Sequence, residues 1–227
     1  MKKLLLLLLL CQSPSLFAQK SRQNPYGLDI INTEEAYRKS VKENPENKLV
    51  DIKKAIPSIV LDIRYATKDN FMQRVMYPKA RALARQPVVN QLKKIQASLK
   101  TKGYGLKIYD AYRPYAITMA FYQQASDKQF VAHPKSGSRH NRGCAIDLSI
   151  INLKTKKELE MPTGYDSFSA AAAPDYKEVT PLARKNREML IKVMESHGFK
   201  VMYNEWWHFD FQGWERFKLM DIPFNKL

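Results

Sequence analysis

Three residues in the second half of the chain carry the side-chain types of a metal site. His140 and Asp147 stand seven residues apart in "SRHNRGCAIDLSI", and His208 lies in "EWWHF". Asp147 interrupts an apolar run that predicts a buried strand, where a carboxylate is costly unless a cation or a metal pairs with it. A turn at Gly143 can fold the preceding loop back and bring His140 to Asp147. Because a catalytic zinc takes three protein ligands and leaves one position for water, we expect His208 to be the third.

Glu205 adds a group that could turn metal binding into hydrolysis. It precedes His208 by three residues, a spacing that in a regular strand points two side chains to opposite faces. We therefore expect Glu205 at a turn or bulge where the strand begins. From there its carboxylate could take a proton from a water molecule at the metal and pass it to a departing amine.

A fixed positive charge is the next candidate. Arg113, in "YDAYRP", stands between a predicted strand and a predicted helix, where a guanidinium can be held at the edge of a cleft. Such a charge could stabilise the oxyanion of a tetrahedral intermediate. The alternative is an ordinary ion pair between Arg113 and Asp110. The other two histidines, His133 and His197, are interpreted as a loop residue and a helix-end residue.

The periodicity of apolar residues predicts the elements that hold these side chains. Helices are expected at 33–44, 86–103, 113–125 and 180–198, and strands at 56–67, 106–112, 144–150 and 199–211. The last segment is expected to form a hairpin or paired strands, and a loop of about thirty residues should precede the last helix. Helices and strands alternate without a strict rhythm, so the predicted class is α+β, with a mainly antiparallel sheet and flanking helices.

The amino-terminal segment predicts export. Residues 1–18 combine a positive start, a leucine run and a small residue at the end, as a secretory signal peptide does. The leucine run is too short to span a bilayer, which needs about 20 apolar residues, so no membrane span is expected. Lipid anchoring at Cys11 is disfavoured because the bulky Leu10 precedes it. We expect a periplasmic or cell-envelope protein with a polar arm at 19–48 and one catalytic domain at 49–227.

Charge and cysteine content restrict the class further. The formal net charge of +16 becomes +14 without Lys2 and Lys3, a balance that suits an acidic polymer, an anionic membrane or nucleic acid. No basic block with interleaved aromatic residues is present, and export argues against nucleic acid, so we expect a basic solvated surface and no nucleic-acid partner. Without the signal, Cys144 is the only cysteine, and its thiol should be shielded.

Several motifs together resemble a known family. "SRHNRGCAIDLSI" resembles the S-x-H-x-x-G-x-A-x-D signature of the zinc D-Ala-specific peptidases, which have a hedgehog-like fold and include the cell-wall D,D-carboxypeptidases. Four further stretches narrow the resemblance to the D-alanyl-D-alanine dipeptidases of the vancomycin-resistance type, which form subfamily D of peptidase family M15. These are "DIRYATKDNF" (62–71), "YDAYRP" (109–114), "MPTGYDSF" (161–168) and "EWWHF" (205–209).

The resemblance covers residues from about 48 to 212 and implies a role for each candidate. One Zn²⁺ per chain is implied, with Glu205 as the catalytic acid/base and Arg113 as the transition-state stabiliser. Three substrate-binding positions are implied as well, namely Ser138, Asp166 and Tyr77, although the stretch around Tyr77 departs from the family's glycine-containing form. The metal ligands implied are those expected from spacing: His140, Asp147 and His208.

The implied activity is zinc-dependent hydrolysis of the D-alanyl-D-alanine dipeptide to two D-alanines. Two alternatives stay open at this point. A D,D- or L,D-carboxypeptidase would trim peptidoglycan stem peptides in an open cleft, whereas a short closed pocket would restrict the enzyme to a dipeptide. A non-catalytic cell-wall module would use a structural metal and bind peptidoglycan through its basic charge, but a structural zinc normally has four protein ligands.

Overall fold

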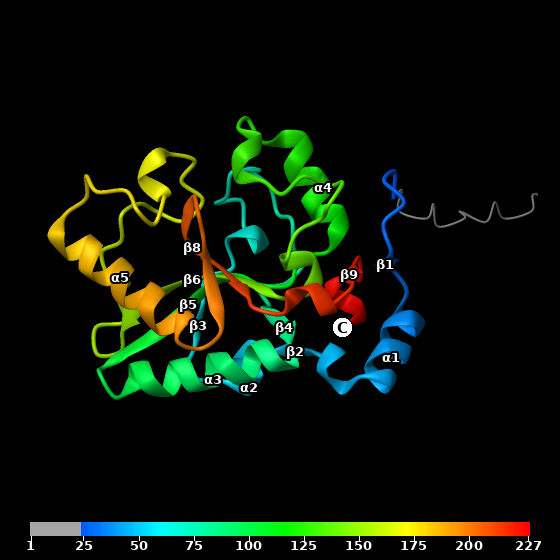
Figure 1. Cartoon of the computed structure of the whole chain (residues 1–227), viewed down its shortest axis with the longest axis horizontal. Helices are drawn as coiled ribbons and strands as arrows, with labels where there is room; N and C mark the ends of the chain where they lie inside the picture. Colours follow the sequence, from blue (N-terminus) through cyan, green and yellow to red (C-terminus); the bar gives the residue numbers. More distant parts are fainter. Residues whose placement is uncertain (1–23) are drawn as a thin grey trace, which may run out of the picture.

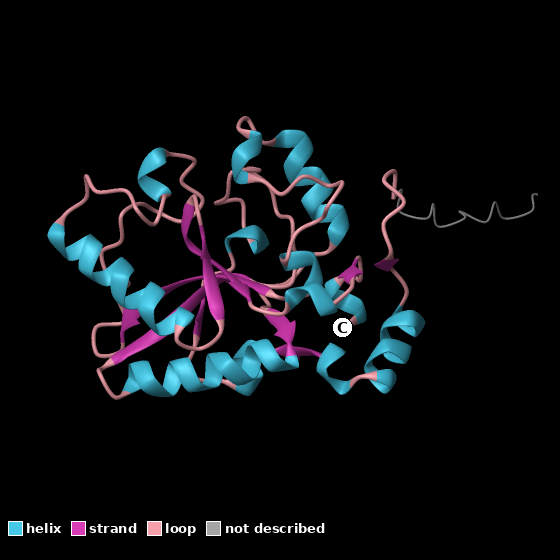
Figure 2. Cartoon of the chain, in the orientation of Figure 1, coloured by secondary structure: helices cyan, strands magenta, loops and turns pink. Residues whose placement is uncertain are grey.

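The computed structural model describes residues 24–227, so the predicted signal peptide and Cys11 lie outside the described residues. A five-stranded sheet with the order β3-β5-β6-β8-β7 occupies the middle of the molecule (Figures 1 and 2). The β3–β5 pair is parallel and the other three pairs are antiparallel. The α+β prediction is confirmed, and the sheet is mixed because of that one pair. Its strands are β3 (Val60–Leu61), β5 (Tyr104–Asp110), β6 (Ala145–Asn152), β7 (Phe199–Met202) and β8 (Glu205–Phe211).

Three longer helices surround the sheet. α3 (Gln86–Lys100) packs against β5 and runs beneath the sheet in Figure 1, while α5 (Pro181–Glu195) packs against β7. α4 (Tyr115–Gln124) begins directly after Pro114. The predicted apolar face of α3 is confirmed, since every residue assigned to it is buried: Val88, Leu92, Ile95 and Leu99.

The start of α5 follows its local sequence. The Thr180 hydroxyl accepts a hydrogen bond of 3.0 Å from the backbone N–H of Ala183, and Pro181 occupies the first turn. Such a cap satisfies one of the donors that a helix start leaves unpaired. The chain leaves the helix through Gly198, whose φ of +81° is left-handed. The prediction of a capped helix in this region is therefore confirmed.

Residues 24–48 contact the rest of the chain through strand pairing, hydrogen bonds and ion pairs. β1 (Ile30–Ile31) pairs in parallel with β9 (Leu219–Met220) near the carboxyl end. The helix α1 (Glu34–Glu43) is capped by Thr33, and the Tyr37 hydroxyl on it accepts a 2.8 Å hydrogen bond from the backbone of Leu49. A second small sheet follows, in which β2 (Leu49–Asp51) pairs with β4 (Leu83–Arg85), and α2 (Ile52–Ala55) continues from β2.

The prediction of one strand over 56–67 is wrong for most of that range. Only β3 is extended and paired, and a 3₁₀ turn over Arg64–Ala66 follows it. The run is apolar because Ile59 and Ile63 are buried, not because it continues along the sheet. Periodicity alone cannot separate a buried strand from a buried turn of the same composition.

Two further expectations concern the thiol and the membrane. Cys144 is fully buried, and burial raises its pKa to about 12, so the shielding predicted for this free thiol is confirmed. Within residues 24–227, none of the helices combines the length and apolar character needed to cross a bilayer.

Candidate metal centre and active site

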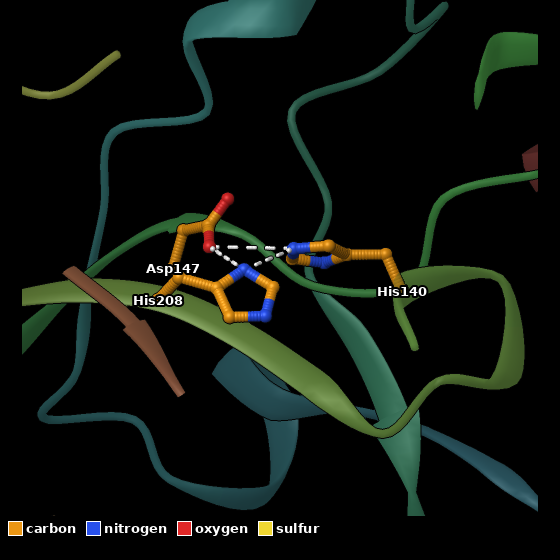
Figure 3. Close-up of side chains that lie close together, drawn as sticks. All are labelled: His140, Asp147 and His208. Atoms are coloured by element: carbon orange, nitrogen blue, oxygen red, sulfur yellow. Dashed lines mark hydrogen bonds and ion pairs between the residues drawn. The ribbon is translucent and has the colours of Figure 1, made fainter. Parts of the chain in front are cut away.

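The three predicted metal ligands meet in the structure (Figure 3). His140 Nε2 lies 3.1 Å from His208 Nδ1 and 3.3 Å from Asp147 Oδ1. His208 Nδ1 and Asp147 Oδ1 are 3.0 Å apart. Two ligands of a tetrahedral zinc, each about 2.0–2.1 Å from the ion, would lie about 3.3 Å from each other. The spacing of the donor atoms therefore suits a single zinc-sized ion.

Each of the two imidazoles has a hydrogen-bond partner on the side away from Asp147. This partner leaves the other ring nitrogen facing the candidate metal position. His140 Nδ1 lies 2.7 Å from the carbonyl oxygen of Ala111, so this nitrogen carries the proton and donates it. His208 Nε2 lies 2.9 Å from Asp210 Oδ1 and is held in the same way. The lone pairs of His140 Nε2 and His208 Nδ1 are left to face Asp147. Outer partners of this kind orient the histidine ligands of metal sites.

The two oxygens of Asp147 have different surroundings. Oδ2 accepts a 3.0 Å hydrogen bond from the Tyr165 hydroxyl, whereas Oδ1 is buried and has no hydrogen-bond partner. A buried carboxylate oxygen without a partner is costly, and a cation at the meeting point of the three donors would satisfy it. Burial alone would raise the pKa of Asp147, but the neighbouring His140 and His208 lower it well below its usual value.

A proton and a metal ion would compete for His208. Burial alone would lower the pKa of its imidazole, but the nearby carboxylates of Asp147 and Asp210 raise that pKa well above its ordinary value. Ligands must be deprotonated to bind a metal, so binding at this centre would release a proton.

The sheet and one turn bring the ligands together. Asp147 on β6 lies directly opposite His208 on β8 in the antiparallel register. His140 comes from a 3₁₀ turn over His140–Arg142, and Gly143 reverses the chain into β6 with a left-handed φ of +71°. The predicted turn at Gly143 is confirmed. It lets a residue seven positions away reach the carboxylate of Asp147.

Glu205 is the first residue of β8, where the β7–β8 pairing is irregular. The register shifts between Val201 and Met202, so the strict alternation of side chains fails here. As a result Glu205 Oε2 lies only 3.7 Å from His208 Nδ1, on the side of the metal centre. Burial raises the pKa of Glu205 to about 7, the range that suits a group which accepts and returns a proton near neutral pH. The expected irregularity at the start of the strand is confirmed.

Arg113 forms the ion pair with Asp110 and also lies near Asp147, so it meets both interpretations of its sequence position, an ordinary ion pair and a charge held at a cleft. Its guanidinium donates to Asp110 Oδ2 at 2.7 and 2.9 Å, and it also lies 3.8 Å from Asp147 Oδ2. Burial alone would lower the pKa of Arg113, but Asp110 raises it well above the ordinary value, so the charge is permanent. The ion pair with Asp110 thus holds a cation at the edge of the metal centre.

The three predicted substrate-binding residues differ in position. Ser138 and Asp166 line the same cavity as the metal centre and Glu205. Tyr77 is almost completely buried, and its hydroxyl donates to Asp110 at 2.9 Å, behind Arg113. It is not among the residues that line the cavity, so the structure brings Tyr77 to the support of Arg113 rather than to the cavity wall.

Asp166 lines this cavity in an unusual backbone conformation. Its φ of +58° is left-handed, which non-glycine residues seldom adopt, and the hydroxyl of Tyr65 donates to its Oδ2 at 2.7 Å. Burial, with the nearby charges of Asp147 and Glu205, raises the pKa of Asp166 well above its usual value. A cation brought to this carboxyl group would favour its ionised form.

Comparison with known proteins agrees with this arrangement. The family model described as "D-ala-D-ala dipeptidase" (Peptidase M15) matches residues 45–221. The chain belongs to this family. The D-alanyl-D-alanine dipeptidase of Escherichia coli (strain K12) is 33% identical over 162 residues, which cover 71% of this chain and 83% of that relative. The protein of the same description from Enterococcus faecalis (strain ATCC 700802 / V583) is 28% identical over 202 residues, 79% of this chain and 95% of that relative.

A likeness among solved structures is weaker. The vancomycin-resistance D,D-dipeptidase VanXYg, solved with a D-Ala-D-Ala phosphinate analog, is 20% identical, with a TM-score of 0.35 over 59% of this chain and 52% of that chain.

The sequence patterns missed part of the cavity of this M15 family member. Five aromatic side chains line it, namely Tyr65, Phe71, Phe121, Phe130 and Phe168. They come from four separate segments, so no local spacing links them. Asp210 was also missed, although the alternation of a strand places it on the same face as His208, two residues earlier. The remaining histidines lie elsewhere, because neither His133 nor His197 lines the cavity.

Proposed function

We propose that the protein hydrolyses D-alanyl-D-alanine to two molecules of D-alanine, using one zinc ion held by His140, Asp147 and His208. The observation that carries the proposal is the convergence of three donor atoms within 3.3 Å of one another, beside a buried carboxylic acid whose pKa is about 7. Membership of the M15 family and the names of the relatives from E. coli and E. faecalis support the same substrate.

Zinc in such a centre supplies Lewis acidity toward the scissile carbonyl and toward the attacking water. Glu205 would accept a proton from that water on Oε2 and later donate it to the nitrogen of the departing D-alanine. Its position 3.7 Å from a ligand atom supports this role. The bond broken is the peptide C–N bond, and the water supplies the oxygen and the two protons that the products gain.

The fixed charge of Arg113 would stabilise the negative charge that develops on the carbonyl oxygen. Asp110 holds its guanidinium, and the Tyr77 hydroxyl orients Asp110 in turn, so we propose for Tyr77 an indirect role in place of direct substrate binding. At the far end of the substrate, Asp166 would accept the ammonium group, with Ser138 contributing a polar contact within the cavity.

The size of the cavity supports a small substrate. Its volume is about 180 Å³, below the range of about 300–1,000 Å³ found for sites that enclose drug-sized ligands. A dipeptide is a better match to this space than a stem peptide.

Replacing the proposed proton carrier tests the function. The zinc-loaded Glu205→Gln variant should keep its metal, because Glu205 is not one of the three ligands, and should lose about 10³-fold or more in kcat/KM. Activity is followed as D-alanine released from D-Ala-D-Ala, with L-Ala-L-Ala as the stereochemical control. Wild-type turnover in this variant, or equal cleavage of the two stereoisomers by the parent protein, would contradict the proposal.

We also propose that the protein is exported to the periplasm or cell envelope, on the strength of the signal-like segment at 1–18. Association with peptidoglycan through the basic surface is part of the same proposal. Cell fractionation with an antibody against the catalytic domain tests it, and recovery of the full-length chain in the cytosol alone would contradict it.

A further inference from the structure

The catalytic cavity adjoins a second hollow, here called the outer groove, and the residues that line both form the wall between them. The two share the lining residues Phe71 and Asp166. The outer groove has a volume of about 360 Å³. Apart from the shared pair its lining is mostly polar: Arg64, Lys68, Asp69, Asn70, Gln73 and Tyr165.

The phenyl ring of Phe71 is packed on three sides by other aromatic rings. Its centroid lies 4.9 Å from that of Phe121, 5.2 Å from that of Phe168 and 6.1 Å from that of Tyr65. Tyr65 in turn donates its hydroxyl hydrogen to Asp166, which ties the two shared residues to one support. The wall is therefore a packed part of the fold and not a loosely placed side chain.

The loop that carries Phe71 is held from within. The side chain of Asn70 donates to three carbonyl oxygens, those of Arg64 (3.2 Å), Thr67 (2.8 Å) and Arg74 (3.0 Å). Its amide oxygen accepts a 2.9 Å hydrogen bond from the backbone of Met72. Four bonds from one side chain fix the turn on both sides of Phe71, so the barrier is built in before any substrate binds.

This wall lies where a longer peptide would have to pass. The inference rests on the proposed function, in which the substrate's ammonium group lies at Asp166. A residue added before that amino terminus would replace the ammonium with an uncharged amide and continue the chain toward the groove. We propose that Phe71 is a specificity-determining residue, which closes the cavity beyond the substrate's amino terminus and restricts cleavage to dipeptides.

The outer groove could hold the added residue of a longer peptide. Its polar side chains could form hydrogen bonds with a peptide backbone. The charge of Arg64 is paired with Asp69, another residue of the groove, at 2.6 Å. With the ring of Phe71 removed, cavity and groove would become one channel. A peptide extended at its amino end could then lie in both.

The test compares two substrates that differ by one residue, D-Ala-D-Ala and L-Ala-D-Ala-D-Ala. The wild-type kcat/KM should favour the dipeptide by about 100-fold or more, because the tripeptide loses its charged partner at Asp166 and meets the wall. Phe71→Ala should reduce this preference at least about 10-fold through faster cleavage of the tripeptide, and Phe71→Leu should fall between. An unchanged preference in folded, zinc-loaded Phe71→Ala would overturn the inference.

Phe130→Ala is the matched control. Phe130 lines the catalytic cavity and stacks on Phe168 at 5.0 Å, but it does not line the groove. Removing its ring enlarges the cavity without opening it toward the groove, so the preference for the dipeptide should stay within about 3-fold of wild type. A shift as large as that of Phe71→Ala would assign the effect to cavity size and sink the proposal.

A binding measurement separates this inference from the proposed function. In zinc-loaded Glu205→Gln protein, titration calorimetry with the tripeptide should show a gain in affinity of about 10-fold when Phe71→Ala is added. If wild type cleaves neither peptide, the proposed function is wrong, and the calorimetric gain still supports a wall at Phe71. Absence of that gain contradicts the wall whatever the rates are.

Discussion

At the scale of single residues, the centre depends on how each polar atom is partnered. One carboxylate oxygen of Asp147 accepts a hydrogen bond from the Tyr165 hydroxyl. The other oxygen faces a ring nitrogen of His140 and one of His208. His208 is oriented by Asp210, whose carboxylate accepts from the nitrogen that faces away from the centre. Burial alone would raise the pKa of Asp210, but the hydrogen bond with His208 lowers it, so Asp210 is an ionised acceptor.

The first prediction concerns Asp210. Asp210→Asn replaces a charged acceptor with a neutral one, so the orientation and basicity of His208 are less well fixed, and zinc affinity should fall about 10- to 100-fold. Competition with a chromophoric chelator measures the affinity directly, and Glu35→Gln on the exposed face of α1 serves as a control with one carboxylate removed elsewhere. Equal zinc affinity in Asp210→Asn and wild type would contradict the role.

Residue types and spacing were enough to predict that Glu205 and the three candidate ligands come together, because a buried carboxylate and a misplaced glutamate are each anomalous within a strand. The supports were not predictable in the same way. The bond between Tyr65 and Asp166 joins positions 101 residues apart, and only the fold brings them together. Tyr77 was predicted to bind substrate on a weak local match. In the structure its hydroxyl contacts Asp110, and substrate binding by Tyr77 stays a prediction.

At the scale of elements, two local irregularities position the chemistry. The left-handed turn at Gly143 returns His140 to the sheet, and the register shift before Glu205 turns that carboxylate to the side of His208. Helices with clear caps, such as α5, were predicted well because the cap and the apolar face are both local. The segment 56–67 failed because its burial comes from tertiary packing.

A substitution at the turn tests its importance. In Gly143→Ala the new Cβ would lie 2.7 Å from Leu49 Cδ2 at a φ of +71°, so Leu49 must move and the backbone is strained. The free energy of unfolding should fall by about 1–2 kcal/mol, as for an L-residue in the left-handed region, and zinc affinity should fall with it. Urea denaturation and the chelator assay measure the two effects.

Gly198→Ala is the control for that experiment. Gly198 has a similar φ of +81°, but a Cβ there would meet no atom within 4 Å, and the residue lies after α5, away from the metal centre. It should lower stability without changing zinc affinity. Equal effects of the two variants on zinc binding would show that Gly143 has no special part in placing His140.

An ion-pair cluster on the sheet gives a prediction about pH. Lys107 Nζ on β5 lies 2.7 Å from Asp62 Oδ2 and 3.0 Å from Glu158 Oε2. Burial alone would raise the pKa of Asp62, but Lys107 and Arg64 lower it below 3.8. A carboxyl group whose folded-state pKa is lowered contributes stability above its unfolded pKa and loses it as the pH falls through the folded value.

Lys107→Met should therefore be less stable than wild type at pH 7 by about 1 kcal/mol, which is about 2–4 °C in Tm for a chain of this size. The difference should shrink as the pH falls through the lowered folded-state pKa of Asp62, because below that pH Asp62 is protonated in both the folded and the unfolded state. Thermal unfolding of both proteins across this pH range is the measurement. A difference that persists at low pH would assign the loss to packing instead of charge.

At the scale of the whole molecule, the metal centre joins parts of the chain that are distant in sequence. The three candidate ligands come from the turn at His140–Arg142, from β6 and from β8. The aromatic side chains and Asp166 line the cavity from other segments, one of which is α4. Composition indicated one domain and a basic surface, but it could not predict pairings such as β1 with β9, which depend on the finished fold. The local motifs predicted the candidate site, and the long-range packing places the aromatic side chains that line its cavity.

The most direct test of the central claim is D-alanine release from D-Ala-D-Ala as a function of zinc added to metal-free protein. Activity should be absent after chelation, rise in proportion to added zinc and reach its plateau at one equivalent per chain, while His208→Ala stays inactive at the same zinc concentration. Full activity in the metal-free protein, or no D-alanine release with one equivalent of zinc bound, would contradict the account.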